Sequence, residues 1–433
     1  MTIHEDRPEA KSVPGTGPQR LRDAPRYLWL VFASTFLGWA FDAMDLNLLT
    51  LVLTETISDL ADTTDRGTIA SIGGTIIALK LLAWGVGGIV FGALTDRFGR
   101  ARILGITVVI YALFTGLSAV ATNVWQLAAF QMLAGLGIGG EWAAGAALLA
   151  ETWPDKLRPK IMQLMQMGFA AGFFLAALLA LIVGPFGWRW VFAAGLVPIL
   201  LTVVMRKFIR EPERWQAARE AAPADQGTLR TTRRLLDRDL RKPTLIAVLL
   251  GIAMMVGSWG GLTWLPSWIT ELSGGPAHVG DSPSHAFMLL NAGAIAGYLT
   301  LMVLSSVLGR RTMFALFCAG ALAVSLVLFT QVDTLSGVMW MMPLYGFFVV
   351  GGFGIFAVYL PELFPTVVRA TGQGLAWNFA RVITAFGVLG SSALVTAFGS
   401  FPAAAAAVAA VYVVGLVAVW FGPETAGRAL RDV

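Results

Sequence analysis

Charged residues are scarce in this sequence: Asp, Glu, Lys and Arg make up 13% of its 433 residues. A soluble domain has about a quarter of its residues charged, so most of this surface must contact something other than water, and lipid is the simplest candidate. The single cysteine, Cys318, excludes a structural disulfide within the chain. What is abundant agrees with lipid contact, because 57% of the residues are hydrophobic and there are 48 glycines and 15 tryptophans.

Several functional signatures are also missing. The sequence has no Gly-rich loop ending in Gly-Lys-Ser/Thr, so an ATP-driven pump is not supported. Its three histidines, His4, His278 and His285, do not form a metal-binding set, and no nucleophile–base arrangement indicates an enzyme. We therefore expect no metal and no cofactor, and no nucleic-acid partner despite the net charge of +5. Residues 1–26 are polar and lack the apolar core of a signal peptide, which predicts a cytoplasmic tail.

Long apolar runs dominate the rest of the chain. A bilayer core of about 30 Å requires about 20 mostly apolar residues per helix. Twelve segments meet this requirement: 27–54, 68–94, 103–121, 125–150, 161–183, 188–208, 243–270, 285–307, 312–330, 336–360, 371–397 and 401–421. The boundary inside 371–421 is the least distinct, since only Gly399, Ser400 and Pro402 interrupt it. The predicted fold is an all-α membrane protein with twelve transmembrane helices.

Basic residues alternate between the segments that join these spans. Of the 31 Lys and Arg residues, 27 lie in the tails and in alternate loops, and 11 of these are in segment 206–242. The opposite loops hold only Arg66 and Arg189, while Lys80 and Arg381 lie inside spans. Because cytoplasmic loops carry the excess of Lys and Arg, both termini are predicted to be cytoplasmic. Segment 206–242 is interpreted as a solvated cytoplasmic linker.

The sequence also contains an internal repeat. Glu151 and Arg158 match Glu362 and Arg369 at an offset of 211 residues, and Pro212-Glu213 matches Pro423-Glu424 at the same offset. Gly99-Arg100 has a reduced counterpart in Gly309-Arg310. Weak symmetry between halves is typical of transporters. The repeat predicts two six-helix bundles, 27–208 and 243–421, joined by a linker over 209–242, with tails at 1–26 and 422–433.

These motifs resemble a known family. The loop from Gly92 to Arg102, which reads GALTDRFGRAR, resembles the signature of the major facilitator superfamily between its second and third helices. The Glu-x6-Arg pattern after spans four and ten resembles the sugar-porter and metabolite:proton symporter branch, as do the Pro-Glu pairs. The resemblance covers the chain from about residue 27 to 430, and it implies alternating access by two bundles that can function as a monomer.

The charged motif residues suggest a latch on the cytoplasmic side. Acidic and basic side chains on the ends of the two bundles could pair when that side is shut and separate when it opens. The alternative is that the basic residues only follow the positive-inside bias, with solvated acidic partners. The residues of this predicted cytoplasmic gate are Asp96, Arg97, Arg100, Glu151, Arg158, Glu362 and Arg369.

Carboxylates inside the spans are candidates for proton coupling, because an ionisable residue in a membrane is costly and usually functional. Asp42 and Asp45 are three residues apart and share a helix face. Their context resembles the first helix of sialate/monocarboxylate and aromatic-acid proton symporters. We expect at least one to carry a proton, with Asp45 slightly favoured. Glu141 follows a Gly-rich run and is interpreted either as a second proton site or as the partner of Lys80.

Two basic residues also lie inside spans. Lys80 is about 18 Å from either end of its helix, too far to reach the interface, so it should face a cavity or a carboxylate. Arg381 shares one side of its helix with Trp377 and Asn378. A guanidinium matches a carboxylate bidentately, and the resemblance to organic-anion symporters implies that Arg381 binds a substrate carboxylate. The alternative is a permanent bridge to an acidic residue of the protein.

Uncharged polar and aromatic residues inside the spans could also line a substrate cavity. These candidates are Gln163, Gln166, Asn291, Trp259 and Trp264. The Gln pair that sugar porters carry in their seventh helix is absent, since residues 257–266 read GSWGGLTWLP. This departure favours an organic anion over a sugar.

The sequence therefore predicts a secondary transporter in a bacterial inner membrane. The expected activity is proton-coupled symport of a small organic anion, a mono- or aromatic carboxylate, with the proton as coupling ion and lipid as the surrounding partner. The alternatives are a sugar or polyol transporter of the same fold, in which Arg381 is structural, and a solute sensor that transports nothing.

Overall fold

A computed structural model describes residues 20–221, 228–263, 265–274, 282–305, 307–389 and 391–431 of the chain. Within these residues the protein consists of helices, turns and loops, without a β-strand. The all-α fold predicted from the sequence is therefore confirmed.

The helices follow the predicted spans in order. The first bundle contains α1 (Arg26–Ala61), α2 (Arg66–Phe98), α3 (Arg100–Ser118), α4 (Val124–Thr152), α5 (Arg158–Val183), α6 (Trp188–Ala194) and α7 (Pro198–Phe208). The second contains α10 (Arg241–Leu262), α11 (Leu265–Leu272), α12 (Ser282–Leu304), α13 (Arg310–Gln331), α14 (Leu335–Tyr345), α15 (Phe353–Leu363), α16 (Arg369–Leu389), α17 (Ser391–Phe398), α18 (Phe401–Ala409) and α19 (Tyr412–Ala418). A π-helical turn over Gly346–Val350 connects α14 to α15.

Most of these segments are long enough to cross a membrane. In the described part of the chain, ten helical segments of at least 18 residues are sufficiently apolar, and Trp188–Thr202 is a shorter apolar segment. The sixth span is interrupted between α6 and α7, where Pro198 begins the second piece. The indistinct boundary near the C-terminus is also resolved: Gly399 takes a left-handed φ of 82°, and the Ser400 hydroxyl accepts a hydrogen bond from Ala403 N to begin α18.

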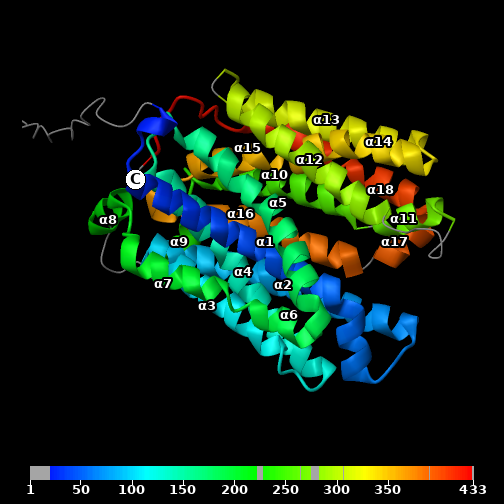
Figure 1. Cartoon of the computed structure of the whole chain (residues 1–433). Coiled ribbons are helices and arrows are strands. Elements are labelled where there is room, and N and C mark those ends of the chain that lie inside the picture. Colours follow the sequence, from blue (N-terminus) through cyan, green and yellow to red (C-terminus); the bar gives the residue numbers. More distant parts are fainter. Residues whose placement is uncertain are drawn as a thin grey trace, which may run out of the picture.

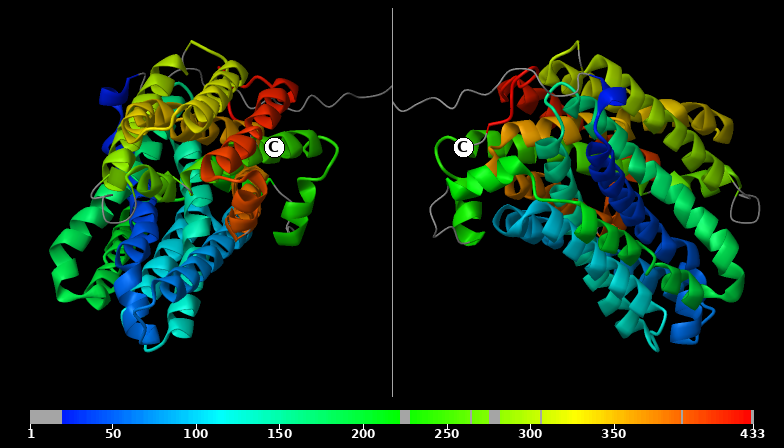
Figure 2. Two further views of the ribbon diagram at one scale, coloured as in Figure 1. Left: turned by 90° about the vertical axis from the view of Figure 1, so that its right-hand side faces the viewer. Right: turned by 60° about the vertical axis from the view of Figure 1, so that its left-hand side comes forward.

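Two ends of the molecule can be distinguished by their loops. One end, which we call the basic end, holds the turn at Gly99, the loop from Trp153 to Leu157, the turn at Gly309 and the loop from Phe364 to Val368. We call the opposite end the far end. Figure 1 shows the N-terminal bundle in blue to green and the C-terminal bundle in green, yellow, orange and red, joined at the basic end beside α8 and diverging toward the far end. The right view in Figure 2 shows the same arrangement.

Glycine allows the two bundles to approach closely along α2 and α16. A Cβ on Gly374 of α16 would lie 2.5 Å from the Gly88 carbonyl oxygen and 3.2 Å from Gly92 Cα. A Cβ on Gly88 would overlap the side-chain amide of Asn378. Small residues let membrane helices pack backbone to backbone, and here they fix α2 against α16 on the side nearer the basic end.

The segment between the bundles is not simply solvated, which corrects the expectation for 206–242. It forms α8 (Glu213–Glu220) and α9 (Thr228–Arg234). The buried residues of this segment include Trp215, Leu235 and Leu240. The Trp215 indole N–H donates to the Asp96 carbonyl at 2.9 Å. The amphipathic linker thus covers the basic end, because its few apolar residues find a partly buried surface there.

Candidate functional site

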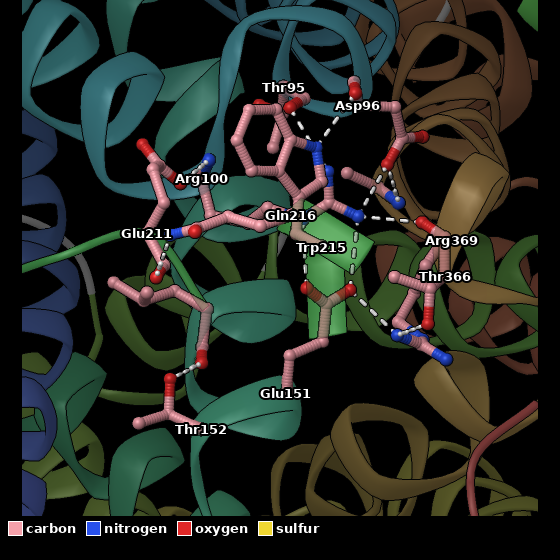
Figure 3. A network of polar contacts seen from close by, with 12 residues as sticks. Thr95, Asp96, Arg100, Glu151, Thr152, Glu211, Trp215, Gln216, Thr366 and Arg369 are labelled. Carbon is pink, nitrogen blue, oxygen red and sulfur yellow. Dashed lines mark hydrogen bonds and ion pairs between the residues drawn. The ribbon is translucent and has the colours of Figure 1, made fainter. Parts of the chain in front are cut away.

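A buried arginine forms the centre of a polar network at the basic end (Figure 3). Arg100 begins α3, and its guanidinium makes two parallel hydrogen bonds of 3.0 Å to the Glu151 carboxylate at the end of α4. It also pairs with Asp96 at 3.0 Å and donates to the Thr95 carbonyl. Such a bidentate pair is among the strongest charge-assisted arrangements. It holds α2, α3 and α4 together within the N-terminal bundle.

The C-terminal bundle repeats this arrangement. Arg310 begins α13 and makes two hydrogen bonds, of 3.0 and 3.1 Å, to the Glu362 carboxylate. It also donates to the Ser305 carbonyl at 2.8 Å, at the position equivalent to Thr95. We call the Arg100–Glu151 and Arg310–Glu362 pairs the two forks. Each fork lies inside one bundle.

A glutamate caps the helix that carries each fork. Glu211 accepts hydrogen bonds from the backbone N–H groups of Arg100, Ala101 and Arg102, and Glu424 accepts them from Arg310 and Arg311. Gly99 makes room for Glu211, because its φ of 114° and its lack of a Cβ suit the tight turn. Partial burial raises the pKa of Glu424, but the four backbone N–H groups of Ala426, Arg310, Arg311 and Thr425 outweigh this and hold the pKa below its usual value.

Sequence reasoning missed part of this symmetry. The repeat aligned Glu213 with Glu424, but the residue that caps α3 is Glu211, which precedes the proline rather than following it. Arg310 was noted only as part of the reduced repeat, although its fork equals that of Arg100. The Gly-Arg pair at the start of both helices was the available signal for it.

Contacts between the bundles close the basic end. Arg369 of α16 pairs with Glu151 of α4 at 2.6 Å. The mirrored pair, Arg158 with Glu362, is looser at 3.8 Å because Arg158 also binds Asp155. We call these two the cross pairs. They join acidic and basic motif residues across the bundles, as the latch hypothesis requires.

Asp96 adds a further contact between bundles. Its carboxylate accepts hydrogen bonds from Ala370 N at 3.2 Å and from Thr371 N at 2.7 Å. A carboxylate at a helix N-terminus is stabilised by the exposed N–H groups and the helix dipole, so Asp96 of α2 caps α16 of the other bundle. Arg97 is exposed, lies over the Phe98 ring at 5.1 Å, and accepts a hydrogen bond from Arg219 at its carbonyl.

A cavity of about 250 Å³ lies between the bundles, nearer the middle of the spans. Its walls come from α1, α2, α5, α10, α12, α15, α16 and the π-helical turn, and they are largely aromatic. The aromatic lining residues are Trp39, Trp84, Phe169, Phe173, Trp259, Phe287, Tyr298, Phe353 and Trp377. The lining extends from Arg381 toward Thr50 and Thr263, which lie closer to the far end.

Arg381 is the one charged residue among those that line this cavity. Its guanidinium carbon lies 3.7 Å from the centroid of the Trp84 ring, and Nη1 donates to Asn378 Oδ1 at 2.6 Å. In the described part of the chain it makes no ion pair with an Asp or Glu. Its Nε is buried without a hydrogen-bond partner, as are the indole nitrogens of Trp39, Trp84 and Trp377. Unused donors therefore gather around a single positive charge.

The cavity is closed on the side of the basic end. Trp142 of α4 and Trp377 of α16 stack across the bundles with ring centroids 4.1 Å apart. Gln163 donates to the Gly354 carbonyl at 2.9 Å, and Gln166 accepts from the Trp142 indole at 3.1 Å. These contacts connect α4 and α5 to α15 and α16 beneath the cavity.

Two carboxyl groups, Asp42 and Glu141, meet inside the N-terminal bundle. Both are fully buried, and they interact with each other. The interaction does not have the geometry of a well-formed hydrogen bond, and none of their four oxygens has a partner that does. The Glu141 carboxyl lies against Gly38, one turn from Asp42 on α1. Two neighbouring buried carboxyls cannot both stay ionised without a counter-charge, so the pair is suited to hold a proton.

Lys80 has a different partner from the one considered in the sequence. Its ammonium lies 2.8 Å from Asp45 Oδ2 and donates to Gln131 Oε1 at 2.9 Å. Thr115 donates a short hydrogen bond to the other oxygen of Asp45. Glu141 is thus not the partner of Lys80, and Asp45, which the sequence slightly favoured as the proton carrier, is held in an ion pair. Asp45 is the carboxylate whose oxygens are both taken, whereas those of Asp42 are not.

The predicted substrate residues separate into two groups. Arg381, Trp377, Gln166, Asn291 and Trp259 line the cavity. Lys80, Asn378 and Gln163 are buried outside the cavity lining. The structure therefore does not place these three side chains in contact with a solute in the cavity. Asn378 instead orients Arg381, because its Nδ2 donates to the Gly374 carbonyl and its Oδ1 accepts from the guanidinium. Trp264 lies outside the described residues.

Comparison with known proteins identifies the family. The family model described as the Major Facilitator Superfamily matches residues 28–388. The chain belongs to this superfamily. Among its relatives, a candidate metabolite transport protein of Haemophilus influenzae is 32% identical over 413 residues, which cover 93% of this chain and 98% of that protein. The protein is therefore a transporter of the major facilitator superfamily and not an enzyme.

Other relatives are named for their solutes. A protein of Cupriavidus pinatubonensis named as a probable 4-methylmuconolactone transporter is 30% identical, covering 93% of this chain and 92% of its own length. The niacin transporter NiaP of Acinetobacter baylyi is 29% identical, with coverage of 94% and 95%. Among solved structures, the proton:xylose symporter XylE bound to 6-bromo-6-deoxy-D-glucose superposes with a TM-score of 0.77 at 18% identity, covering 94% of this chain and 98% of that one. At that identity XylE confirms the fold alone.

Proposed function

We propose that this major facilitator transporter carries a small organic anion together with a proton. The observation that carries the proposal is Arg381: a buried guanidinium faces an aromatic cavity and makes no salt bridge to an Asp or Glu among the described residues, with Asp42 acting on it only at longer range. Leaving a charge unpaired in a low-dielectric site is costly, and a substrate carboxylate would supply the missing partner. The flat aromatic walls suit a planar or unsaturated acid.

The proton is proposed to bind at Asp42 and Glu141. Their position in the N-terminal bundle, close enough for Asp42 to interact with Arg381, supports coupling between proton and anion. A negatively charged pair would oppose a second negative charge in the cavity, whereas a protonated pair would not. Binding of the anion therefore favours binding of the proton, and each raises the affinity for the other.

Movement of the loaded site is proposed to occur by alternating access in an inner membrane of a bacterium, with the basic end in the cytoplasm. The internal repeat supports alternating access. The concentration of Lys and Arg at the basic end supports the orientation. The cross pairs, the Trp142–Trp377 stack and the Asp96 cap close this end. They are the contacts that would have to separate for release into the cytoplasm.

The relatives support the class of solute. Their names include 4-methylmuconolactone, niacin, cis,cis-muconate, sialic acid, 3-(3-hydroxy-phenyl)propionate and gentisate, most of them small unsaturated or aromatic compounds. The predicted sugar alternative has the fold of XylE in its favour but no feature of the cavity, since a neutral sugar would leave Arg381 without a counter-charge.

The deciding experiment is uptake into proteoliposomes of labelled monocarboxylates, aromatic acids and sugars, with and without an inward proton gradient. Accumulation of an acid that depends on the gradient, and that is lost in Arg381→Lys at normal protein levels, is expected. Uptake of neutral solutes alone, or normal uptake by Arg381→Lys, would reject the proposal. As a control, an electroneutral ionophore that dissipates the pH gradient should abolish accumulation of the acid. It should not block the exchange of labelled for unlabelled acid.

A further inference from the structure

A second cavity, of about 720 Å³, lies between α3 and α7 of the N-terminal bundle. Figure 1 shows these two helices side by side on the edge of that bundle, on the side turned away from the C-terminal bundle. None of the residues that line this cavity lines the one between the bundles. We call it the lateral groove. Because it is separate from the proposed solute site, what it binds does not depend on the identity of the solute.

The walls of the lateral groove are mostly apolar. They are formed by Ile106, Val109, Ile110, Met205 and Ile209. The Ile106 side chain is 42% exposed, and Leu200 of α7 is 68% exposed. Exposed apolar side chains on a membrane helix contact lipid chains, which are as apolar as leucine. The groove therefore opens toward the hydrocarbon of the bilayer, and an acyl chain is the apolar group available to fill it.

An unpaired positive charge lies at the end of the groove that is nearer the basic end. Arg102 belongs to the first turn of α3, it lines the groove, and its side chain is exposed. In the part of the chain that the structure describes, its guanidinium makes no hydrogen bond and no ion pair. Lys207 and Arg210, which flank the lining residue Ile209, are exposed as well. This end of the groove thus complements a negatively charged group.

Glu211 also lines the groove, but its carboxylate is already engaged. Its oxygens accept hydrogen bonds from the backbone N–H groups of Arg100, Ala101 and Arg102 at 2.6, 3.2 and 2.9 Å. These bonds and the dipole of α3 compensate the negative charge of the carboxylate. They also occupy the first N–H groups of the helix, so an anion in the groove has to be bound by the Arg102 side chain.

The groove also contains a buried hydroxyl without a partner. Thr202 of α7 lines the groove and is 6% exposed, and its Oγ1 makes no hydrogen bond among the described residues. Other buried threonines in the spans, such as Thr56 and Thr95, donate to the backbone carbonyl four residues earlier. Thr202 does not, although a buried hydroxyl without a partner is costly. It is therefore a donor that a ligand in the groove can use.

These groups follow one another from the basic end into the bilayer. Arg102 precedes Gly105 by about one helical turn, and Gly105 lies against Thr202, since a Cβ on Gly105 would be 3.4 Å from Thr202 Cγ2. Thr202 is about 9 Å from the end of α7 at Phe208, at a rise of 1.5 Å per residue. A phospholipid presents its phosphate, its ester carbonyls and its acyl chains in the same order.

We propose that the lateral groove is a binding site for one anionic phospholipid. The Arg102 guanidinium binds the phosphate, for which its planar array of donors is suited. The Thr202 hydroxyl donates to an ester carbonyl, and an acyl chain fills the apolar walls. Lys207 and Arg210 favour a headgroup with net negative charge over a zwitterionic one.

The C-terminal bundle provides a comparison for Arg102. Alignment of Gly99-Arg100 with Gly309-Arg310 places Thr312 at the position of Arg102 and Arg311 at that of Ala101. The Arg311 guanidinium donates to the Trp420 carbonyl at 2.7 Å and lies over the Trp420 ring. The fork of the C-terminal bundle thus forms without an arginine at the third position of its helix. Arg102 is therefore not required by the fork, which leaves it available for a ligand.

The test measures lipid binding to the purified full-length protein after delipidation in a neutral detergent, by native mass spectrometry and by equilibrium titration. The probes are dioleoyl phosphatidylglycerol, dioleoyl phosphatidylcholine, glycerol 3-phosphate and oleate. One phosphatidylglycerol should bind about tenfold more tightly than phosphatidylcholine, which has the same chains but no net charge. Glycerol 3-phosphate and oleate should each bind more weakly than phosphatidylglycerol, because each lacks one part of the lipid.

Variants then assign the residues. Arg102→Gln should weaken phosphatidylglycerol binding about tenfold, and Thr202→Val should weaken it about threefold, the loss of one neutral hydrogen bond. Val109→Trp places a large side chain in the groove and should abolish the site. Lys242→Gln removes an exposed charge at the start of α10 in the other bundle and should leave binding unchanged. Thermal unfolding without added lipid shows which variants are folded.

Three results would overturn the proposal. Equal affinity for the two phospholipids, or equal losses in Arg102→Gln and Lys242→Gln, would mean that lipid contacts this surface without a specific site. Glycerol 3-phosphate that binds as tightly as phosphatidylglycerol would indicate a site for a free phosphate, and oleate that does so would indicate a site for a fatty acid. None of these results bears on solute uptake, so the proposed function is tested separately.

Discussion

Arg369 Nη1 lies 2.6 Å from Glu151 Oε1, although the two residues belong to different bundles. Both side chains are buried, and Arg369 also donates to the Pro361 carbonyl and to the Thr366 hydroxyl of its own bundle. The mirrored cross pair, Arg158 with Glu362, is 1.2 Å longer at 3.8 Å. The two cross pairs therefore do not contribute equally to closure.

Arg369→Ala should open the basic end more than Arg158→Ala does. Arg369 makes the tighter cross pair, at 2.6 Å, whereas Arg158 is shared with Asp155 and lies 3.8 Å from Glu362. The readout is labelling of a cysteine at Gln373, a residue that is fully buried behind the closed end, by a membrane-impermeant maleimide. Equal labelling in both variants would contradict this ranking.

Arg381→Lys should lower the transport efficiency, kcat/KM, for the accepted acid by about 100-fold or more, because an ammonium can neither form a bidentate pair nor stack on Trp84 in the same way. Asn378→Ala should have a smaller effect of about tenfold, since it removes only the hydrogen bond that orients the guanidinium. Initial uptake rates at equal protein levels measure both. An Asn378→Ala variant as impaired as Arg381→Lys would mean that Asn378 contacts the solute directly.

Asp45→Asn should destabilise the folded protein by about 3–5 kcal/mol, because it leaves Lys80 as an uncompensated buried charge. The double variant Asp45→Asn, Lys80→Met should recover most of this loss. Thermal unfolding in detergent gives the comparison. If the single and double variants melt together, Lys80 has another counter-charge in the folded state.

Asp42→Asn should uncouple transport from the proton gradient. Exchange of labelled for unlabelled solute needs no net proton movement, so it should persist while accumulation against a gradient is lost. Glu141→Gln should behave in the same way, since the two carboxyls form one site. Gradient-driven accumulation that survives in both variants would place the proton elsewhere.

Gly88→Ala should impair both transport and stability, because the new methyl group would overlap the Asn378 amide where α2 packs on α16. Gly74→Ala, on the same helix but with nothing within 4 Å of its added Cβ, is the matched control. It should be neutral or stabilising by about 0.5–1 kcal/mol, the usual gain of alanine over glycine in a helix. A similar loss in both variants would indicate a general intolerance of α2 rather than a packing contact.

The fold could be predicted from the sequence because its determinants are local. Span length and hydropathy follow from the bilayer, and the breaks follow from Gly, Pro and Ser, as at Gly399 and Ser400. The repeat of Glu151 and Arg158 in Glu362 and Arg369 indicated two bundles without any three-dimensional information. The linker was misjudged because its burial depends on the surface formed when both bundles close, not on its own composition.

The site was only partly predictable, because several of its contacts depend on how the helices pack against each other. Arg381 and Asp42 stood out because charge is rare inside spans. Which carboxylate holds Lys80 depends on how α1, α2 and α4 rotate against each other, and Asp42 and Asp45 differ by less than one helical turn. Side chains such as Asn47 and Trp39 carry no distinguishing pattern, since an amide or indole in a span can equally bridge two helices or face lipid.

Glu151 belongs to a fork and to a cross pair at once: Arg100 holds it from its own bundle and Arg369 from the other. When the bundles separate as proposed, the carboxylate keeps its bidentate partner, and Arg369 keeps the Pro361 carbonyl and the Thr366 hydroxyl. Both the Glu151 carboxylate and the Arg369 guanidinium therefore keep hydrogen-bond partners when the bundles separate. The closed and open arrangements then differ by one charge–charge contact and not by a stranded buried ion, which favours a latch that opens and closes reversibly.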